Sequence, residues 1–223
     1  MFLQSKEKEV YNYRQKERRG LECRNLYMSI RQRFILAKVR RKNIWRELSQ
    51  EYDPEMIIVA PQLSDWGETS ADQTIALVEY FLENYNIDEE RVYAEGYSGG
   101  GETLSQVMGK RPDLFTAYLQ CSSQWDGDYG PVVESRLPVY FVIGEDDEYY
   151  GSEPSEEAYE TLRDMYREEG LSDEEIDELL VLDVKDAEYF ESRGVEYQHG
   201  GGNLFAADGE IMGWLFGKDK MHY

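Results

Sequence analysis

Several residue types are scarce in this 223-residue chain, and each scarcity narrows what the protein can be. The two cysteines, Cys23 and Cys121, are too few for a disulfide framework or a cysteine-rich metal site. Mean hydropathy is −0.69, and no apolar run is long enough to form a transmembrane helix. Residues 1–6 hold too short an apolar stretch for a signal peptide. We therefore expect a cytoplasmic location, or an extracellular one if an original N-terminus has been lost.

Aspartate is absent before Asp53, and the two parts of the chain carry opposite charge. Residues 1–48 hold 14 lysines and arginines against five glutamates, a net charge of +9. The remaining residues hold 10 lysines and arginines against 41 acidic residues, a net charge of −31. A basic arm can bind nucleic acid or a membrane surface, but this one lacks a stacking platform, zinc spacing or glycine loop. Because the acidic body would repel both partners, we expect neither nucleic acid nor membrane binding.

From Glu55 onward the chain alternates strand-like and helix-like segments, as a single α/β domain does. Two capping-box patterns, at residues 70–73 and 172–175, predict helix starts. Short apolar runs predict strands at residues 56–60, 91–95, 115–119, 139–143 and 195–197. This alternation predicts a mostly parallel sheet covered by helices on both faces.

Residues 1–48 do not follow this alternation. They contain one apolar patch, at residues 34–37, set among basic residues, and they offer no convincing opening strands. We therefore divide the chain into an atypical basic segment, residues 1–48, and a domain, residues 49–223. A truncated gene or a shifted reading frame would explain the abrupt change of composition, and the upstream nucleotides read in three frames would test this hypothesis.

The motif Gly96-Tyr97-Ser98-Gly99-Gly100 lies between a predicted strand and a predicted helix. A serine on a sharp strand-to-helix turn needs small neighbours, because the strained backbone leaves little room. Such a turn exposes the serine hydroxyl and points the Gly99 amide toward the oxyanion that forms on attack. A phosphate-binding glycine turn is the alternative, but neither Gly-Lys-Ser/Thr nor Gly-x-Gly-x-x-Gly spacing is present. The context favours a nucleophilic serine.

A nucleophilic serine needs a base, and the chain has only two histidines, His199 and His222. His222 is the penultimate residue, where chains tend to fray. His199 follows the strand predicted at residues 195–197 and precedes three glycines, a loop from which an imidazole can reach a neighbouring strand end. A loop histidine without a task is the alternative, but the position favours His199 as the base.

The third partner is expected at a strand end between Ser98 and His199 in sequence. The strand predicted at residues 139–143 runs into Gly144 and then into a cluster of acidic residues. Asp147 is the first choice for the acid, and Asp146 is the second. Most acidic residues of this region belong to the solvated surface, so only the strand end distinguishes these two. The resulting order, Ser, Asp and His, is that of α/β-hydrolases.

Together these motifs resemble the esterase and polyhydroxybutyrate-depolymerase-like group of α/β-hydrolases, which includes feruloyl-esterase-like proteins and predicted peptidases. The resemblance spans roughly residues 55–217 and is carried by residues 86–100, 112–115, 143–147 and 198–200. It implies the α/β-hydrolase fold, with Ser98 as nucleophile, Asp147 as orienting acid and His199 as base. No metal or cofactor is implied.

The surroundings of this triad are less complete in the sequence. Tyr97, Trp125 and Trp66 are candidate substrate contacts, although each tryptophan is equally consistent with packing. The second amide of the oxyanion hole comes from a loop upstream of residues 56–60 in this fold, often marked His-Gly. Residues 1–48 contain no His-Gly and a single glycine, Gly20, so the opening strands and this loop are expected to be missing.

Three functions remain open. The first is a serine hydrolase that cleaves carboxylic esters through an acyl-enzyme, on a small molecule or a polysaccharide-linked ester, with a serine peptidase as a variant. The second is a catalytically impaired or non-catalytic protein of the same fold that lacks a complete oxyanion hole. Binding of nucleic acid or anionic lipid by the basic arm is the third and least favoured.

Overall fold

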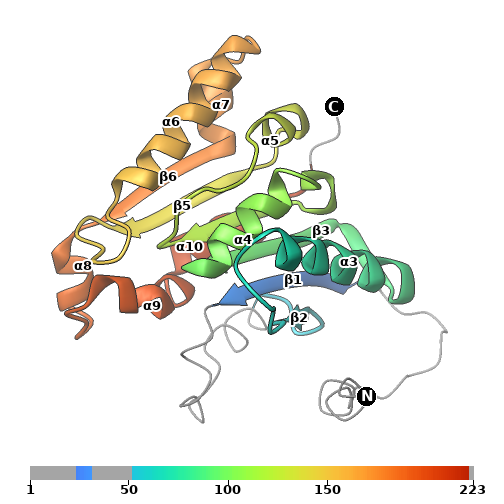
Figure 1. The fold of residues 1–223 in the computed structure, drawn as a ribbon, viewed down its shortest axis with the longest axis horizontal. Coiled ribbons are helices and arrows are strands. Elements are labelled where there is room, and N and C mark those ends of the chain that lie inside the picture. The colour runs from blue at the N-terminus through green and yellow to red at the C-terminus, as the bar shows by residue number, and fades with distance from the viewer. Residues whose placement is uncertain (1–23, 32–51, 221–223) are drawn as a thin grey trace.

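The computed structural model describes residues 24–31 and 52–220, which form a sheet between two layers of helices (Figure 1). Six strands of the described part lie in the order β2-β1-β3-β4-β5-β6, and all neighbours are parallel. The strands are β1 (Arg24–Arg31), β2 (Ile57–Val59), β3 (Ile87–Tyr97), β4 (Ala117–Cys121), β5 (Val139–Gly144) and β6 (Leu180–Lys185). The predicted parallel α/β sheet is confirmed.

Helices cover both faces of the sheet because the buried side chains of its strands alternate between them. Along β3, Ala94 packs with α4 on one face, and Tyr93 packs with α10 on the other. The first face carries α3 (Glu68–Asn84), α4 (Gly99–Met108), α5 (Gly130–Ser135), α6 (Glu153–Glu168) and α7 (Asp173–Leu179). The second face carries α8 (Ala187–Glu191), α9 (Gly202–Ala206) and α10 (Gly209–Phe216). The described part also contains two short 3-10 helices, η1 (Pro112–Leu114) and η2 (Gln198–Gly201).

Strand β1 lies within the N-terminal segment for which we expected no strands, and that expectation is wrong. β1 sits between β2 and β3, where Leu26 pairs with Ile57 on one side and with Val92 on the other. Leu26 and Met28 are fully buried, which is the period-two pattern of a strand, but the surrounding basic residues obscure it in the sequence. The rest of residues 1–48 lies outside the described residues, so the domain boundary after residue 48 stays a prediction.

The strand predicted at residues 195–197 does not form, and β6 is the last strand of the described chain instead. β6 begins at Leu180, directly after α7 ends at Leu179. The apolar residues of helix and strand are contiguous there, so no polar break marks the change of period. Val195 instead donates its backbone N–H to the carbonyl oxygen of Phe190 and closes a turn after α8.

The two predicted capping boxes have different outcomes. At α7 the prediction is confirmed, because the Ser172 hydroxyl and the Glu175 side chain each accept the other residue's backbone N–H. At α3 it is wrong, because the helix begins at Glu68 and Ser70 lies within it. The carboxylate of Asp65 accepts the N–H groups of Gly67 and Ser70 and takes over the capping role.

Gly96 lets β3 pass directly beneath the start of α4. A Cβ atom at Gly96 would lie 2.7 Å from Gly101 Cα and 2.8 Å from the carbonyl oxygen of Gly100, and both are backbone atoms that cannot turn aside. We expect Gly96→Ala to destabilise the fold by about 1–3 kcal/mol, measured by urea unfolding. Gly209→Ala is the matched control, because nothing lies within 4 Å of a Cβ there and α10 should gain about 0.4–1 kcal/mol. Equal urea midpoints for both variants would contradict the prediction.

Candidate active site

Ser98 stands on the tight turn between β3 and α4, with φ of 55° and ψ of −132°. A non-glycine residue pays a conformational cost of about 1–3 kcal/mol in such a region, so its neighbours must hold it there. The Ser98 N–H donates to the carbonyl oxygen of Cys121 at 3.1 Å, and the Ser123 hydroxyl donates to the Ser98 carbonyl at 2.7 Å. The end of β4 thereby holds the turn in place. The serine itself is fully buried.

The structure brings the three predicted side chains into one hydrogen-bonded line. Ser98 Oγ lies 3.1 Å from His199 Nε2, and His199 Nδ1 lies 3.0 Å from both carboxylate oxygens of Asp147. An ionised Asp147 can only accept, so Nδ1 carries a proton and Nε2 is left as the acceptor for the serine hydroxyl. This is the arrangement in which a histidine can take a proton from Ser98.

The pKa of Asp147 is set by two opposing effects. Burial raises this pKa. The hydrogen bond with His199 and those from the backbone N–H groups of Tyr150 and Tyr149 together lower it by more than burial raises it. The net pKa lies below the usual value, so the carboxyl group is ionised at neutral pH. Asp146, the second choice for the acid, is exposed, and its backbone N–H donates to the side chain of Gln198. The geometry therefore favours Asp147.

The backbone of the histidine loop is anchored from two sides. The carboxylate of Glu148 accepts the N–H groups of Gln198 and His199, at 3.1 and 3.0 Å. The hydroxyl of Tyr97 donates to the carbonyl oxygen of His199, and the two rings are stacked with centroids 5.6 Å apart. Tyr97 is 3% exposed, and both its hydroxyl and its ring contact His199, so it supports the histidine loop. Its role as a substrate contact stays a prediction.

The two candidate tryptophans lie in different surroundings. A Cβ atom at Gly99 would lie 2.7 Å from the ring of Trp66, which places this half-buried indole against the residue whose amide is expected to bind the oxyanion. Trp125 instead stacks on Tyr129 with centroids 5.4 Å apart and packs against Phe141 in the core. These contacts favour packing for Trp125, whereas Trp66 remains a candidate substrate contact.

The oxyanion side of the site is only partly within the described residues. The Gly99 N–H begins α4 immediately after the nucleophile, as the sequence predicts. Arg31, the last residue of β1, pairs with Tyr97, so β1 ends beside the turn that carries Ser98. In this fold the second oxyanion amide comes from the loop after the strand in that position. Gln32 and the residues that follow it lie outside the described part, as does His222.

Sequence reasoning missed two side chains that contact this line of residues, those of Tyr149 and Tyr150. Tyr149 is 64% exposed and stacks on the ring of His199, with centroids 5.1 Å apart. Tyr150 lies against the same ring and donates its hydroxyl proton to Glu102 in α4. A usable signal was present, because backbone N–H groups two and three residues after an aspartate commonly bond to its carboxylate. That geometry brings the side chains at these positions close to the acid.

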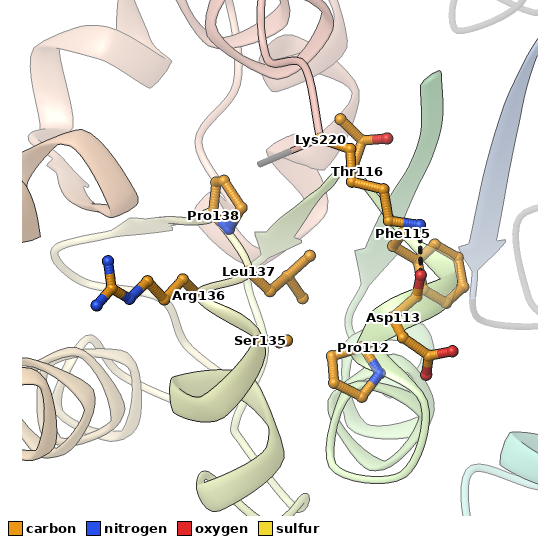
Figure 2. Close-up of a pocket in the computed structure, with 9 residues that line it drawn as sticks. All are labelled: Pro112, Asp113, Phe115, Thr116, Ser135, Arg136, Leu137, Pro138 and Lys220. Carbon is orange, nitrogen blue, oxygen red and sulfur yellow. Dashed lines mark hydrogen bonds between the residues drawn. The ribbon is translucent and has the colours of Figure 1, made fainter. Parts of the chain in front are cut away.

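Three other features bear on function: possible metal sites, membrane-spanning helices and a small cavity. Within residues 24–31 and 52–220, no three histidine, cysteine or acidic side chains are grouped to hold a metal ion, and no helix is long and apolar enough to cross a membrane. A cavity of about 40 Å³ lies near the amino ends of β4 and β5, where Lys220 donates to the Asp113 carbonyl (Figure 2). Ligand sites usually exceed about 300 Å³, so this cavity is too small for a substrate.

Comparison with known proteins places this geometry in a family context. The model of the prolyl oligopeptidase family matches residues 63–173. A thermostable esterase superimposes on 88% of this chain, with a TM-score of 0.67 and 19% identity. Est1E from Butyrivibrio proteoclasticus, with ferulic acid bound, also superimposes on 88% of this chain, with a TM-score of 0.61 and 14% identity. The chain has the α/β-hydrolase fold. The resemblance to the esterase-like group of this fold is confirmed.

The extent of these similarities differs. This chain covers 91% of Est1E but only about half, 55%, of the thermostable esterase. Over 43 residues it is 42% identical to feruloyl esterase B of Thermothelomyces thermophilus. This match covers 19% of this chain and 15% of that protein. Both structures are under 25% identical to this chain, so they share its fold, and its substrate must be argued from its own site.

Proposed function

We propose that this α/β-hydrolase cleaves carboxylic esters through an acyl-enzyme formed on Ser98. The observation that carries the proposal is the line from Ser98 Oγ through His199 to Asp147, with both steps at 3.0–3.1 Å. The local similarity to a feruloyl esterase and the esterase structures of the same fold support an ester as substrate.

In the proposed mechanism each residue moves or holds one proton or charge. His199 Nε2 takes the proton of Ser98 as Oγ attacks the ester carbonyl, and the Gly99 N–H stabilises the oxyanion. The histidine then protonates the departing alcohol, which leaves the acyl group on Ser98. Water that is deprotonated by His199 attacks this acyl-enzyme and releases the acid. Asp147 stabilises the imidazolium in both halves.

A serine peptidase is the second candidate, because the model of the prolyl oligopeptidase family matches residues 63–173 of this chain. Peptide and ester hydrolysis use the same triad, so the geometry of Ser98, His199 and Asp147 is compatible with both. The two differ in the leaving group, and matched chromogenic esters and peptide anilides separate them.

A fluorophosphonate probe tests the proposal most directly, because it reacts with activated serines whether or not turnover is fast. We expect stoichiometric labelling of the folded protein, mapped by mass spectrometry to Ser98, and hydrolysis of 4-nitrophenyl esters faster than of peptide 4-nitroanilides. Labelling without hydrolysis would favour the catalytically impaired alternative. A protein that is neither labelled nor active would exclude the hydrolase function.

A further inference from the structure

Glu102 and Tyr150 form a polar pair beside the nucleophile that the proposed mechanism does not use. Glu102 lies one helical turn after Ser98 in α4, and its Oε1 accepts the Tyr150 hydroxyl at 2.6 Å. The backbone N–H of Tyr150 donates to Asp147 at 3.0 Å, and its ring lies 5.5 Å from the His199 ring. Tyr150 is therefore next to the acid and the base at once.

This pair offers only hydrogen-bond acceptors to a bound molecule. Burial raises the pKa of Tyr150, as does the hydrogen bond to Glu102, while a hydrogen bond with Ser98 opposes this rise only in part. The phenol therefore keeps its single proton, and that proton is given to Glu102. One lone pair of the Tyr150 oxygen and the second carboxylate oxygen of Glu102 remain as acceptors. Both residues are half-buried, so these acceptors can still be reached.

The negative charge of Glu102 is not offset by a neighbouring cation in the described part of the chain, where every recorded ion pair involves other carboxylates. A carboxylate so close to Ser98 favours ligands that donate hydrogen bonds and disfavours anionic ones. A hydroxyl or a protonated amine meets this requirement.

The position of the pair indicates which half of an ester it meets. In a serine hydrolase the histidine protonates the departing alcohol. Groups that surround the imidazole therefore lie near the alcohol part of the ester. Tyr150 lies against the His199 ring, whereas Trp66 lies against Gly99, the residue expected to supply the oxyanion amide. Because the Tyr150 ring lies 5.5 Å from the ring of His199, whose Nε2 lies 3.1 Å from Ser98 Oγ, a group that reaches Tyr150 must lie close to the scissile bond.

We propose that Glu102 and Tyr150 form a specificity subsite for a hydrogen-bond donor, hydroxyl or ammonium, on the alcohol part of the ester within a few bonds of the ester oxygen. The inference rests on the proposed ester hydrolysis by Ser98. It selects polyol or amino-alcohol esters over simple alkyl esters, and it selects against alcohols that carry a carboxylate.

Four esters of one acid test this subsite, with the acyl group taken from the best 4-nitrophenyl substrate. The alcohols are ethanol, ethylene glycol, 2-(dimethylamino)ethanol and glycolic acid, and kcat/KM is measured by pH-stat. A hydrogen bond to a charged group corresponds to roughly 10- to 100-fold, so we expect the 2-hydroxyethyl ester to exceed the ethyl ester by this factor. The carboxymethyl ester should be slower than the ethyl ester.

Ratios within each variant separate specificity from overall activity. In Glu102→Gln the 2-hydroxyethyl to ethyl ratio should fall toward one, and the carboxymethyl ester should gain relative to ethyl. Tyr150→Phe should lower the first ratio while the penalty on the carboxymethyl ester persists. Glu83→Gln, an equal change of charge at an exposed position of α3, is the matched control and should keep the wild-type ratios.

The outcomes distinguish the subsite from the proposed function. If wild type cleaves 4-nitrophenyl esters but shows no preference among the four alcohols, the subsite is refuted and ester hydrolysis stands. A Glu102→Gln protein with wild-type ratios would refute it as well. If wild type cleaves none of these esters, both proposals fail. A preference confined to the dimethylamino ester would support the ammonium and reject the hydroxyl.

Discussion

Replacing Ser98 with alanine is expected to reduce kcat for ester hydrolysis by about 10⁶-fold, the loss seen when a triad nucleophile is removed. Alanine lacks the oxygen that lies 3.1 Å from His199 Nε2, so no acyl-enzyme can form. The residual rate would come from water positioned in the site and from the oxyanion hole. Turnover of a 4-nitrophenyl ester by the two purified proteins measures the effect.

The backbone of the turn should survive this substitution. Its hydrogen bonds to Cys121 and Ser123 use only main-chain atoms of residue 98, so the melting temperature of Ser98→Ala should stay near that of wild type. Ser64→Ala serves as the control, because Ser64 is exposed and, among residues 24–31 and 52–220, bonds only to the Gln73 side chain. Hydrolysis that persists in Ser98→Ala would mean that another residue, or a contaminant, is responsible.

Asp147→Asn is the second large effect, with an expected loss of about 10⁴-fold in kcat. The carboxylate accepts from Nδ1 of His199 with both oxygens, which leaves Nε2 free to take the serine proton. An asparagine amide can instead donate to Nδ1. The proton then moves to Nε2, and the imidazole can no longer act as a base toward Ser98.

The neighbouring residue supplies a matched control for this prediction. Asp146→Asn makes the same change of charge one residue earlier, but this carboxylate is exposed, and within the described residues the recorded hydrogen bond of Asp146 is that of its main-chain N–H to Gln198. We expect its rate to stay within a few-fold of wild type. If both variants lost activity equally, the acid would be misassigned or the whole loop displaced.

The sequence predicts the core of this site because each triad residue follows a recognisable local pattern. The glycines around Ser98 mark the turn, the apolar strand before Gly144 marks the acid, and the rarity of histidine leaves His199. The predicted strand before His199 is wrong. His199 nevertheless lies beside Ser98, because Glu148 and Tyr97 hold its backbone in place. Chain order alone was therefore enough, although the local structure assumed for it was not.

What the sequence did not reveal depends on contacts between distant segments. The pairing of Glu102 with Tyr150 joins residues 48 positions apart, and no local pattern marks either one. β1 was missed for a different reason: its hydrophobic alternation is short and lies among basic residues, and its burial comes from β2 and β3 on either side. In each case the deciding energy is tertiary, which propensity and periodicity do not record.

The four consecutive residues from Asp147 to Tyr150 all contact His199. Asp147 orients the imidazole, Glu148 fixes its main chain, and Tyr149 and Tyr150 border its ring. Because these contacts come from consecutive positions, their spacing is as important as their identity. One residue added to or removed from this loop would shift all four out of phase at once. The length of this loop is therefore part of how it positions the histidine.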